Sequence, residues 1–419
     1  MAGYQSPDVT RERLQDDYLS IRRASEQSCE PLAIDDYQLQ SMASASPPKW
    51  HLGHVTWFFE TFLLQPFTAG YSAFHPRFDY LFNSYYYRVG SMQPRAERGL
   101  LSRPTVEQVY AYRAHVDRAM LGLIEGCKPS DWPQVRQRIS LGLNHEQQHQ
   151  ELFYMDIKHH FSMNPLLPAY RDDLPLPDSA ESPRGRWIEG EEGILEIGHA
   201  GEGFSFDNER ERHKTFLAPH RLMDRLVTNG EYLAFIQDNG YDRVDLWLSD
   251  GWDQIRRAGW RHPLYWHLED GRWLEFTLGG LRPLSPASPV AHVSYYEADA
   301  FARWSGKRLP REAELERKSA ALPMDGNFHD QGYLHPRPGS RQWYGDLWEW
   351  TCSPYTAYPG FRPSAGAIGE YNGKFMCNQM VLRGGCCVTP KEHMRPTYRN
   401  FFYPHERWMF SGIRLAMGS

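Results

Sequence analysis

A change in sequence character near residue 163 constrains the fold of this 419-residue chain more than any other feature. Before it, apolar residues recur at helical spacing, whereas after it glycine and proline are scattered and apolar runs are short. The intervening stretch is rich in proline, which is typical of a boundary between domains. We therefore expect a helical domain at 1–164, a linker at 165–186 and a second domain at 187–419.

The first domain is predicted to be an antiparallel four-helix bundle. Spaced apolar residues and helix-start signals indicate helices at 8–26, 50–65, 105–124 and 130–161. The connection 67–103 is too long for a bundle turn and is rich in Tyr, Phe and Arg, so we expect a functional loop. In the second domain only 229–239 and 294–305 have helical spacing, which indicates short strands, long ordered loops and an α+β fold overall.

Composition excludes several classes of protein. The net charge of −6 argues against a generally basic nucleic-acid binder. No apolar stretch reaches the ~18 residues of a membrane-spanning helix, and the polar N-terminus lacks the apolar core of a signal peptide. We therefore expect a cytoplasmic protein with no membrane partner, while the sequence leaves the oligomeric state open. Aromatic residues at 14% and 18 histidines favour a small-molecule pocket and a metal site.

The sharpest local signal is a pair of histidines four residues apart. His145 and His149 would lie on one face of a helix, where both imidazoles can reach one metal ion. The segment Trp50–His54 offers His51 and His54 as candidates for a third ligand from a facing helix. Imidazole suits zinc, copper, iron and nickel, so the ligand type alone does not choose the metal.

The same residues match a zinc-protease motif. In His145-Glu146-x-x-His149 the glutamate would act as the general base of a metalloprotease. Such enzymes normally take their third ligand from further along the chain, and residues 150–200 offer no recognisable spacing for it. This zinc metalloprotease remains the main alternative from a different reaction class.

Taken together, the motifs resemble those of the ergothioneine sulfoxide synthases (EgtB). The histidine motifs look like those of the DinB-like iron-binding domain of that family. The second half resembles a formylglycine-generating-enzyme-type domain, a variant of the C-type-lectin-like fold, through 206–209, 227–232, 307–314, 345–351, 382–385 and 411–415. These stretches follow the order of the family and cover nearly the whole chain.

The resemblance implies a non-haem Fe(II), O2-dependent oxidoreductase. Such an enzyme joins the sulfur of a thiol to the imidazole C2 of hercynine and oxidises that sulfur to the sulfoxide. By position, the iron ligands would be His54, His145 and His149, and Gln148 would hold the hercynine ring. An amide can hydrogen-bond a ring nitrogen without binding the metal.

Further positions resemble the branch of the family that uses free cysteine. Tyr85 and Tyr86 match a tyrosine pair that takes part in the oxidation, and a phenol can supply a proton there. Arg95 and Arg98 would be the arginines that bind the carboxylate of the thiol substrate. Asn400, Phe401 and Phe402 would form a substrate-facing motif near the C-terminus. The expected partners are therefore small molecules: hercynine, cysteine and O2.

Two other readings of this fold stay open. A selenoneine synthase that uses a selenosugar has the same architecture, and the sequence does not distinguish cysteine, γ-glutamylcysteine and a selenosugar. A lectin-like domain can also serve binding alone. The intact His54, His145, His149 and Tyr86 argue against that interpretation. The adjacent Cys386 and Cys387 would point to opposite faces of a strand, so we expect them to pack rather than share a metal.

Overall fold

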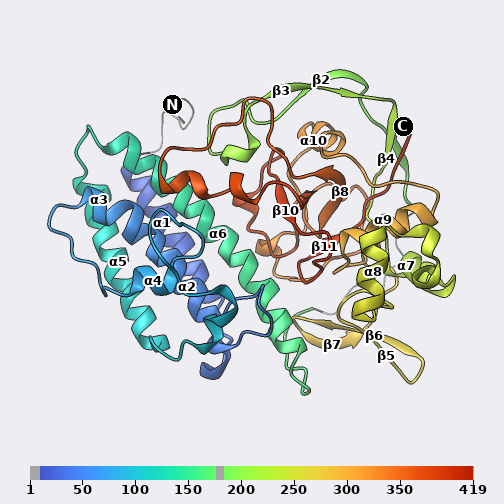
Figure 1. Ribbon diagram of the computed structural model, residues 1–419, viewed down its shortest axis with the longest axis horizontal. Helices are drawn as coiled ribbons and strands as arrows, with labels where there is room; N and C mark the ends of the chain where they lie inside the picture. The colour runs from blue at the N-terminus through green and yellow to red at the C-terminus, as the bar shows by residue number, and fades with distance from the viewer. Residues whose placement is uncertain (1–9, 176–183, 419) are drawn as a thin grey trace. The chain divides into compact units, whose positions relative to one another are not determined.

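The computed structural model describes residues 10–175 and 184–418, which divide into two units (Figure 1). Unit 1 contains the chain up to residue 163 together with two short later segments, 201–206 and 363–372. Unit 2 contains 164–200, 207–362 and 373–419. The mixed helix and strand content confirms the predicted α+β class.

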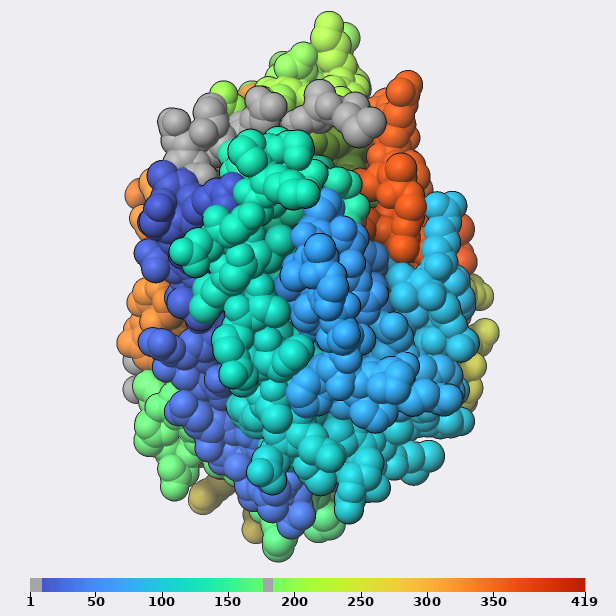
Figure 2. Space-filling view, turned by 90° about the vertical axis from the view of Figure 1, so that its left-hand side faces the viewer, coloured from blue at the N-terminus to red at the C-terminus, as the bar shows by residue number. Residues whose placement is uncertain are grey.

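Unit 1 is a helical bundle, as predicted. Its helices are α1 (Arg11–Gln27), α2 (Pro48–Phe59), α3 (Gln65–Phe67), α4 (Phe78–Phe82), α5 (Val106–Gly126) and α6 (Trp132–Ser162). The four long helices are α1, α2, α5 and α6, and α2 continues through a π-helical turn at Glu60–Leu64. Figure 2 shows one face of this unit, where blue and teal segments form a continuous surface.

Helix α2 is the central element of the bundle, because all of its residues are buried. It begins at Pro48, where the fixed φ of proline suits the first helical turn. Gly53 allows close packing, since a Cβ there would lie 2.2 Å from the ring of Phe82. This contact brings the end of α4 against α2, at the level of His54.

A cluster of buried charges joins α6 to α1 and α5. The Glu146 carboxylate accepts hydrogen bonds from Arg22 at 2.9 Å, Arg113 at 3.2 Å and the hydroxyl of Ser25 at 2.7 Å. Arg22 also pairs with Asp117 on α5 at 2.7 Å. Because buried charges are tolerated only when paired, these contacts fix the rotation of α6 about its axis.

Unit 2 is built from small sheets and short helices. Its strands are β1 (Trp187–Glu189), β2 (Gly193–Ile197), β3 (His213–Leu217), β4 (His220–Met223), β5 (Trp266–Glu269), β6 (Arg272–Thr277), β7 (Gly280–Pro283), β8 (Trp348–Pro354), β9 (Met380–Arg383), β10 (Asn400–Phe402), β11 (Ser411–Gly412) and β12 (Ala416–Gly418). They form sheets in the orders β1-β4-β12, β10-β9-β8-β11, β2-β3 and β5-β6-β7. All neighbours are antiparallel except β11 and β8, which are parallel.

The helices of unit 2 correct one expectation. The predicted helices are present as α7 (Asn229–Gln237) and α9 (Tyr295–Trp304), but α8 (Ser249–Ala258) and α10 (Glu312–Ala320) were not predicted. Helix α10 buries charged residues instead of an apolar stripe: Glu312 accepts hydrogen bonds from Arg383 and Arg399. An apolar periodicity therefore could not reveal it.

The predicted linker at 165–186 lies partly outside the described residues, at 176–183. Its first part contacts the turn between β6 and β7. The backbone N–H of Tyr170 donates to the Leu278 carbonyl at 2.9 Å, and Arg282 donates to the carbonyls of Leu174 and Pro175. This stretch therefore follows the surface of unit 2.

Cys386 and Cys387 are buried in a turn after the end of β9, and not within the strand that we expected. The Cys386 sulfur accepts a hydrogen bond from the Thr389 hydroxyl at 3.3 Å.

Among the helices of the described ranges, none combines the length and apolar composition needed to cross a bilayer.

The charge cluster around Glu146 predicts a large stability change. Glu146→Gln keeps the shape of the side chain but leaves Arg22 and Arg113 without their shared negative charge. Loss of one partner of a buried pair costs about 3–5 kcal/mol, so we expect the free energy of unfolding in urea to fall by about that amount. Glu125→Gln, on the exposed end of α5, is the control and should change it by less than about 0.5 kcal/mol. Equal stability of the two variants would contradict this role of Glu146.

Candidate metal centre

Three histidines from two helices converge in unit 1. His54 comes from α2, whereas His145 and His149 come from α6. One ring nitrogen of each lies within 4.8 Å of the others, and the Nε2 atoms of His54 and His145 are 3.2 Å apart. Ligands at about 2.0–2.1 Å from one ion, at about 90–109° to each other, would be about 2.8–3.4 Å apart. The donor set therefore fits a single metal ion.

The local contacts of His54 leave its Nε2 available for a metal. Its Nδ1 donates a hydrogen bond to the Phe82 carbonyl at 2.6 Å, so the proton of the neutral ring is on Nδ1. The Trp50 ring stacks on it, with 4.6 Å between ring centroids and 11° between planes. These contacts fix both the tautomer and the orientation of the ring.

Burial keeps the three imidazoles neutral. It lowers the pKa of His145 to about 3 and is also the main cause of the lowered pKa values of His54 and His149. A neutral imidazole has one nitrogen lone pair for a metal, which an imidazolium lacks. The site therefore presents neutral nitrogen donors at ordinary pH.

His51, the other candidate ligand on α2, has both ring nitrogens in hydrogen bonds. Its Nδ1 is 2.8 Å from Nδ1 of His149, and its Nε2 is 3.0 Å from Oδ2 of Asp156. Burial alone would raise the pKa of Asp156, but hydrogen bonds from His51 and the Ser46 backbone outweigh it, so the pKa is lowered. Of the two histidines, the geometry favours His54 as the ligand.

Glu146 does not face the three histidines in the way that the protease alternative requires. A general base must reach a water molecule on the metal. Glu146 instead directs its carboxylate toward Arg22, Arg113 and Ser25. The metalloprotease interpretation is therefore wrong, because the glutamate is part of the structural charge cluster.

The predicted tyrosine pair is separated from these histidines by one aromatic ring, since Trp57 contacts both Tyr86 and His54, and the two tyrosines have different environments. Tyr86 is fully buried against Trp57 and Phe62, and burial, together with Tyr85, raises its pKa well above the usual range. Its hydroxyl has no hydrogen-bond partner of ordinary geometry in the described part of the chain. Tyr85 is half-buried and stacks on Tyr86, with ring centroids 4.7 Å apart.

A residue that the sequence did not single out, Tyr371, also lies at the site. It belongs to the segment 363–372 that is part of unit 1. Its ring meets the His145 ring edge to face at 5.5 Å, and its hydroxyl donates to Oε1 of Gln148. The ring of Tyr85 lies 6.3 Å from the Tyr371 ring, measured between centroids. Gln148, predicted to contact substrate, is thus placed among aromatic rings beside the histidines.

Glu370 anchors this segment to the loop that contains Tyr85, Tyr86 and Tyr87, called the tyrosine loop below. Its carboxylate accepts hydrogen bonds from the backbone N–H groups of Tyr87 at 3.1 Å and Arg88 at 3.0 Å. Because Glu370 directly precedes Tyr371, the same contact determines where the Tyr371 ring lies relative to Tyr85. No sequence pattern signals it, since 363–372 has no periodicity.

The two predicted arginines differ sharply. Arg98 is buried, and its guanidinium lies 3.4 Å from the centre of the Trp50 ring, which stacks on His54. It donates to the hydroxyls of Ser46 and Ser84, but no carboxylate of the described residues pairs with it. Burial lowers its pKa well below the usual range, and Arg95 lowers it further. Arg95 itself is exposed and donates to the Ser44 carbonyl.

The remaining predicted residues lie in unit 2, on β10. Phe401 stacks on Tyr355 with ring centroids 4.0 Å apart, and Phe402 meets Trp408 edge to face at 5.5 Å. The Asn400 side chain accepts a hydrogen bond from the backbone N–H of Phe401. Their contact with substrate stays a prediction.

Comparisons with known families agree with the two halves of the chain. Residues 18–155 match the DinB superfamily, and residues 178–337 and 332–418 match the sulfatase-modifying factor enzyme 1-like domain. The chain thus joins a DinB-type bundle, which carries three convergent histidines, to a domain of this enzyme family.

Similar proteins refine this class. A hercynine oxygenase of Mycolicibacterium smegmatis is 30% identical over 97% of this chain and 99% of its own length. One from Mycobacterium tuberculosis is 30% identical over 94% of this chain and 97% of its own. Ergothioneine biosynthesis protein 1 of Schizosaccharomyces pombe is 27% identical over 51% of this chain and 27% of its own length. The chain belongs to the hercynine oxygenase family of oxidoreductases, as its motifs predicted.

The anchoring role of Glu370 predicts a local change in backbone protection. In Glu370→Ala the amides of Tyr87 and Arg88 lose a charged acceptor, which contributes about 1.5 kcal/mol or more per hydrogen bond. Hydrogen exchange at these two amides should then become about tenfold faster, while amides in α5 keep their rates. Glu97→Ala, on the exposed 3-10 turn Arg95–Leu100, is the matched control. Unchanged exchange in Glu370→Ala would contradict the anchor.

Proposed function

We propose that the chain is an iron(II)- and O2-dependent sulfoxide synthase that joins the sulfur of cysteine to the imidazole C2 of hercynine. One C–H and one S–H bond are broken, and a C–S bond forms. One oxygen atom of O2 becomes the sulfoxide oxygen, and the other leaves as water with the two hydrogens. The observation that carries the proposal is the position of a buried cation beside three convergent neutral imidazoles. The Arg98 guanidinium packs on the Trp50 ring, which also stacks on His54.

The metal would be held by His54, His145 and His149. A face of three nitrogens leaves up to three positions open on an octahedral ion, and imidazole suits iron(II). When bound there, iron would hold the thiolate and supply the redox chemistry for O2. The chain itself contributes donors that are already neutral and oriented, so little rearrangement is needed on binding.

Arg98 is proposed to bind the carboxylate of the thiol. A guanidinium forms strong, charge-assisted hydrogen bonds with a carboxylate, and burial strengthens them. Arg98 is held by Trp50 and two serine hydroxyls, so it is positioned before substrate binds. Since the Arg95 side chain is exposed, one buried cation is available for one carboxylate, which favours cysteine over γ-glutamylcysteine.

Hercynine is proposed to bind beside Gln148. Its ring nitrogen would exchange hydrogen bonds with the amide that Tyr371 now contacts. Aromatic faces attract a trimethylammonium group through cation–π interaction, and both Tyr371 and Tyr85 present rings near this amide. The tyrosine loop therefore contributes to binding as well as to the reaction.

Tyr85 and Tyr86 are proposed to hold the proton that the oxidation consumes. A phenol with a raised pKa stays protonated and can donate to a developing negative charge. Tyr86 meets this condition, because it is fully buried and its hydroxyl has no ordinary partner among the described residues. Tyr85 stacks on it and is the more accessible of the two.

A product assay tests the proposal. Anaerobically iron-loaded protein receives hercynine, O2 and one of three donors: cysteine, γ-glutamylcysteine or a selenosugar. We expect mass spectrometry to detect the hercynyl-cysteine sulfoxide with cysteine, and O2 uptake to match its formation.

The control is His149→Ala, which should lose stoichiometric iron and at least a hundredfold of this activity. Turnover with the selenosugar alone would identify a selenoneine synthase. Turnover with γ-glutamylcysteine alone would contradict the assignment of Arg98 to a single carboxylate. No O2 uptake with any donor would contradict the proposed reaction, and the binding-only reading of the fold would then stand.

A further inference from the structure

We propose that His51 is a positioning residue, which holds the His149 imidazole in the tautomer and direction that metal binding requires, and that Asp156 fixes His51 in turn. The inference rests on the proposed metal site and extends it to two side chains that are not ligands. Three contacts carry it: His149 to His51, His51 to Asp156, and Asp156 to the backbone of Ser46.

The Asp156 carboxylate determines which atom donates in each hydrogen bond of this series. Oδ2 of Asp156 accepts from the Ser46 N–H at 2.8 Å and can only accept from His51, so Nε2 of His51 donates. The proposal places the lone pair of His51 on Nδ1, which accepts from Nδ1–H of His149 at 2.8 Å. His149 therefore has its lone pair on Nε2, the nitrogen that remains for a metal.

The helix geometry makes this arrangement rigid. Asp156 follows His149 by seven residues on α6, close to two helical turns, so both side chains leave the helix on the same face. His51 comes from the first turn of the fully buried α2 and reaches both of them. A metal-ligating histidine usually donates its other ring N–H to an acceptor that fixes its tautomer and orientation, and His51 would be that acceptor for His149.

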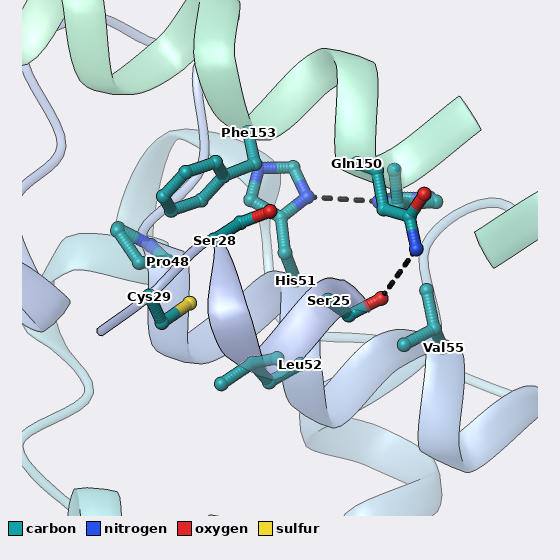
Figure 3. Close-up of a pocket in the computed structure, with 10 residues that line it drawn as sticks. Ser25, Ser28, Cys29, Pro48, His51, Leu52, Val55, Gln150 and Phe153 are labelled. Atoms are coloured by element: carbon teal, nitrogen blue, oxygen red, sulfur yellow. Dashed lines mark hydrogen bonds between the residues drawn. The ribbon is translucent and has the colours of Figure 1, made fainter. Parts of the chain in front are cut away.

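The space around His51 is small and partly apolar. The two rings line a cavity of about 20 Å³ (Figure 3), whose other walls include Leu52, Val55 and Phe153. Two polar side chains there donate to other groups: Gln150 donates to Ser25 at 3.0 Å, and Ser28 donates to the Ala24 carbonyl at 3.0 Å. Removing the His51 ring would enlarge the cavity and take away the acceptor that Nδ1–H of His149 uses in the structure.

The same network reaches Arg98. Ser46 donates its backbone N–H to Asp156 and accepts a hydrogen bond on its hydroxyl from Arg98 at 2.9 Å. One residue thus connects the support of a metal ligand with the proposed carboxylate site. His51 and Asp156 are therefore expected to influence the metal directly and the thiol only through Ser46.

Metal affinity measured by chelator competition tests the role of His51, with cobalt(II) and anaerobic iron(II) as probes. Loss of such a support typically weakens metal binding 10–100-fold, which we expect for His51→Ala, together with a shift of the ligand-field bands of the cobalt protein. His51→Asn keeps an acceptor near the position of Nδ1 and should recover much of the loss. Asp156→Asn should fall between the two.

Cys29→Ala is the matched control, because Cys29 lines the same cavity and takes no part in the contacts that join His149, His51 and Asp156. Its metal affinity should stay within about twofold of the parent. Thermal melting followed by circular dichroism establishes that each variant is folded, and if His51→Ala is not, His51→Asn and Asp156→Asn decide the test.

Two results would overturn the inference. Parent-like affinity and spectra in folded His51 variants would show that His149 needs no support. Complete loss of bound metal at saturating cobalt(II) in both His51 variants would show that His51 is itself a ligand. A parent protein that binds neither metal would instead refute the proposed function, so the two failures are distinguishable.

Discussion

The desolvation of three imidazoles is the constraint on which the rest of this site depends. Buried histidines stay neutral, and a neutral ring offers a lone pair on one nitrogen only, so the other nitrogen must be held by a donor–acceptor contact of the correct sense. The structure supplies the Phe82 carbonyl for His54 and the His51 ring for His149. The direction of these two hydrogen bonds determines where a metal can bind.

A residue beside His145 on α6 explains why the histidines of this helix point inward. Glu146 lies next to His145 in sequence, yet it is paired with Arg22 and Arg113 on neighbouring helices. A rotation of α6 that moved the histidines away would separate these charges in a buried environment, at a cost of several kcal/mol. The motif that resembles a protease therefore has a different physical meaning here: the glutamate aligns the helix that carries His145 and His149.

The sequence predicted the bundle, the domain order and the convergence of three histidines, because these follow from local spacing. It left His51 and His54 undecided, since both lie on one helix and the decision depends on Phe82 and Asp156, which are distant in the chain. Asp156 had a usable signal, its seven-residue spacing from His149. Tyr371 and Glu370 had none, because a segment without periodicity brings them to the histidines only through tertiary structure. Helix α10 was missed for a related reason, as its buried face is charged.

X-ray absorption spectroscopy of the anaerobically iron(II)-loaded protein tests the central claim most directly. The account predicts an iron centre with three imidazole ligands in the parent, and two in His54→Ala if any iron remains. The number of imidazoles should stay at three in His51→Asn. Four imidazoles in the parent, a carboxylate from the protein among the ligands, or an iron spectrum that His54→Ala leaves unchanged would contradict it.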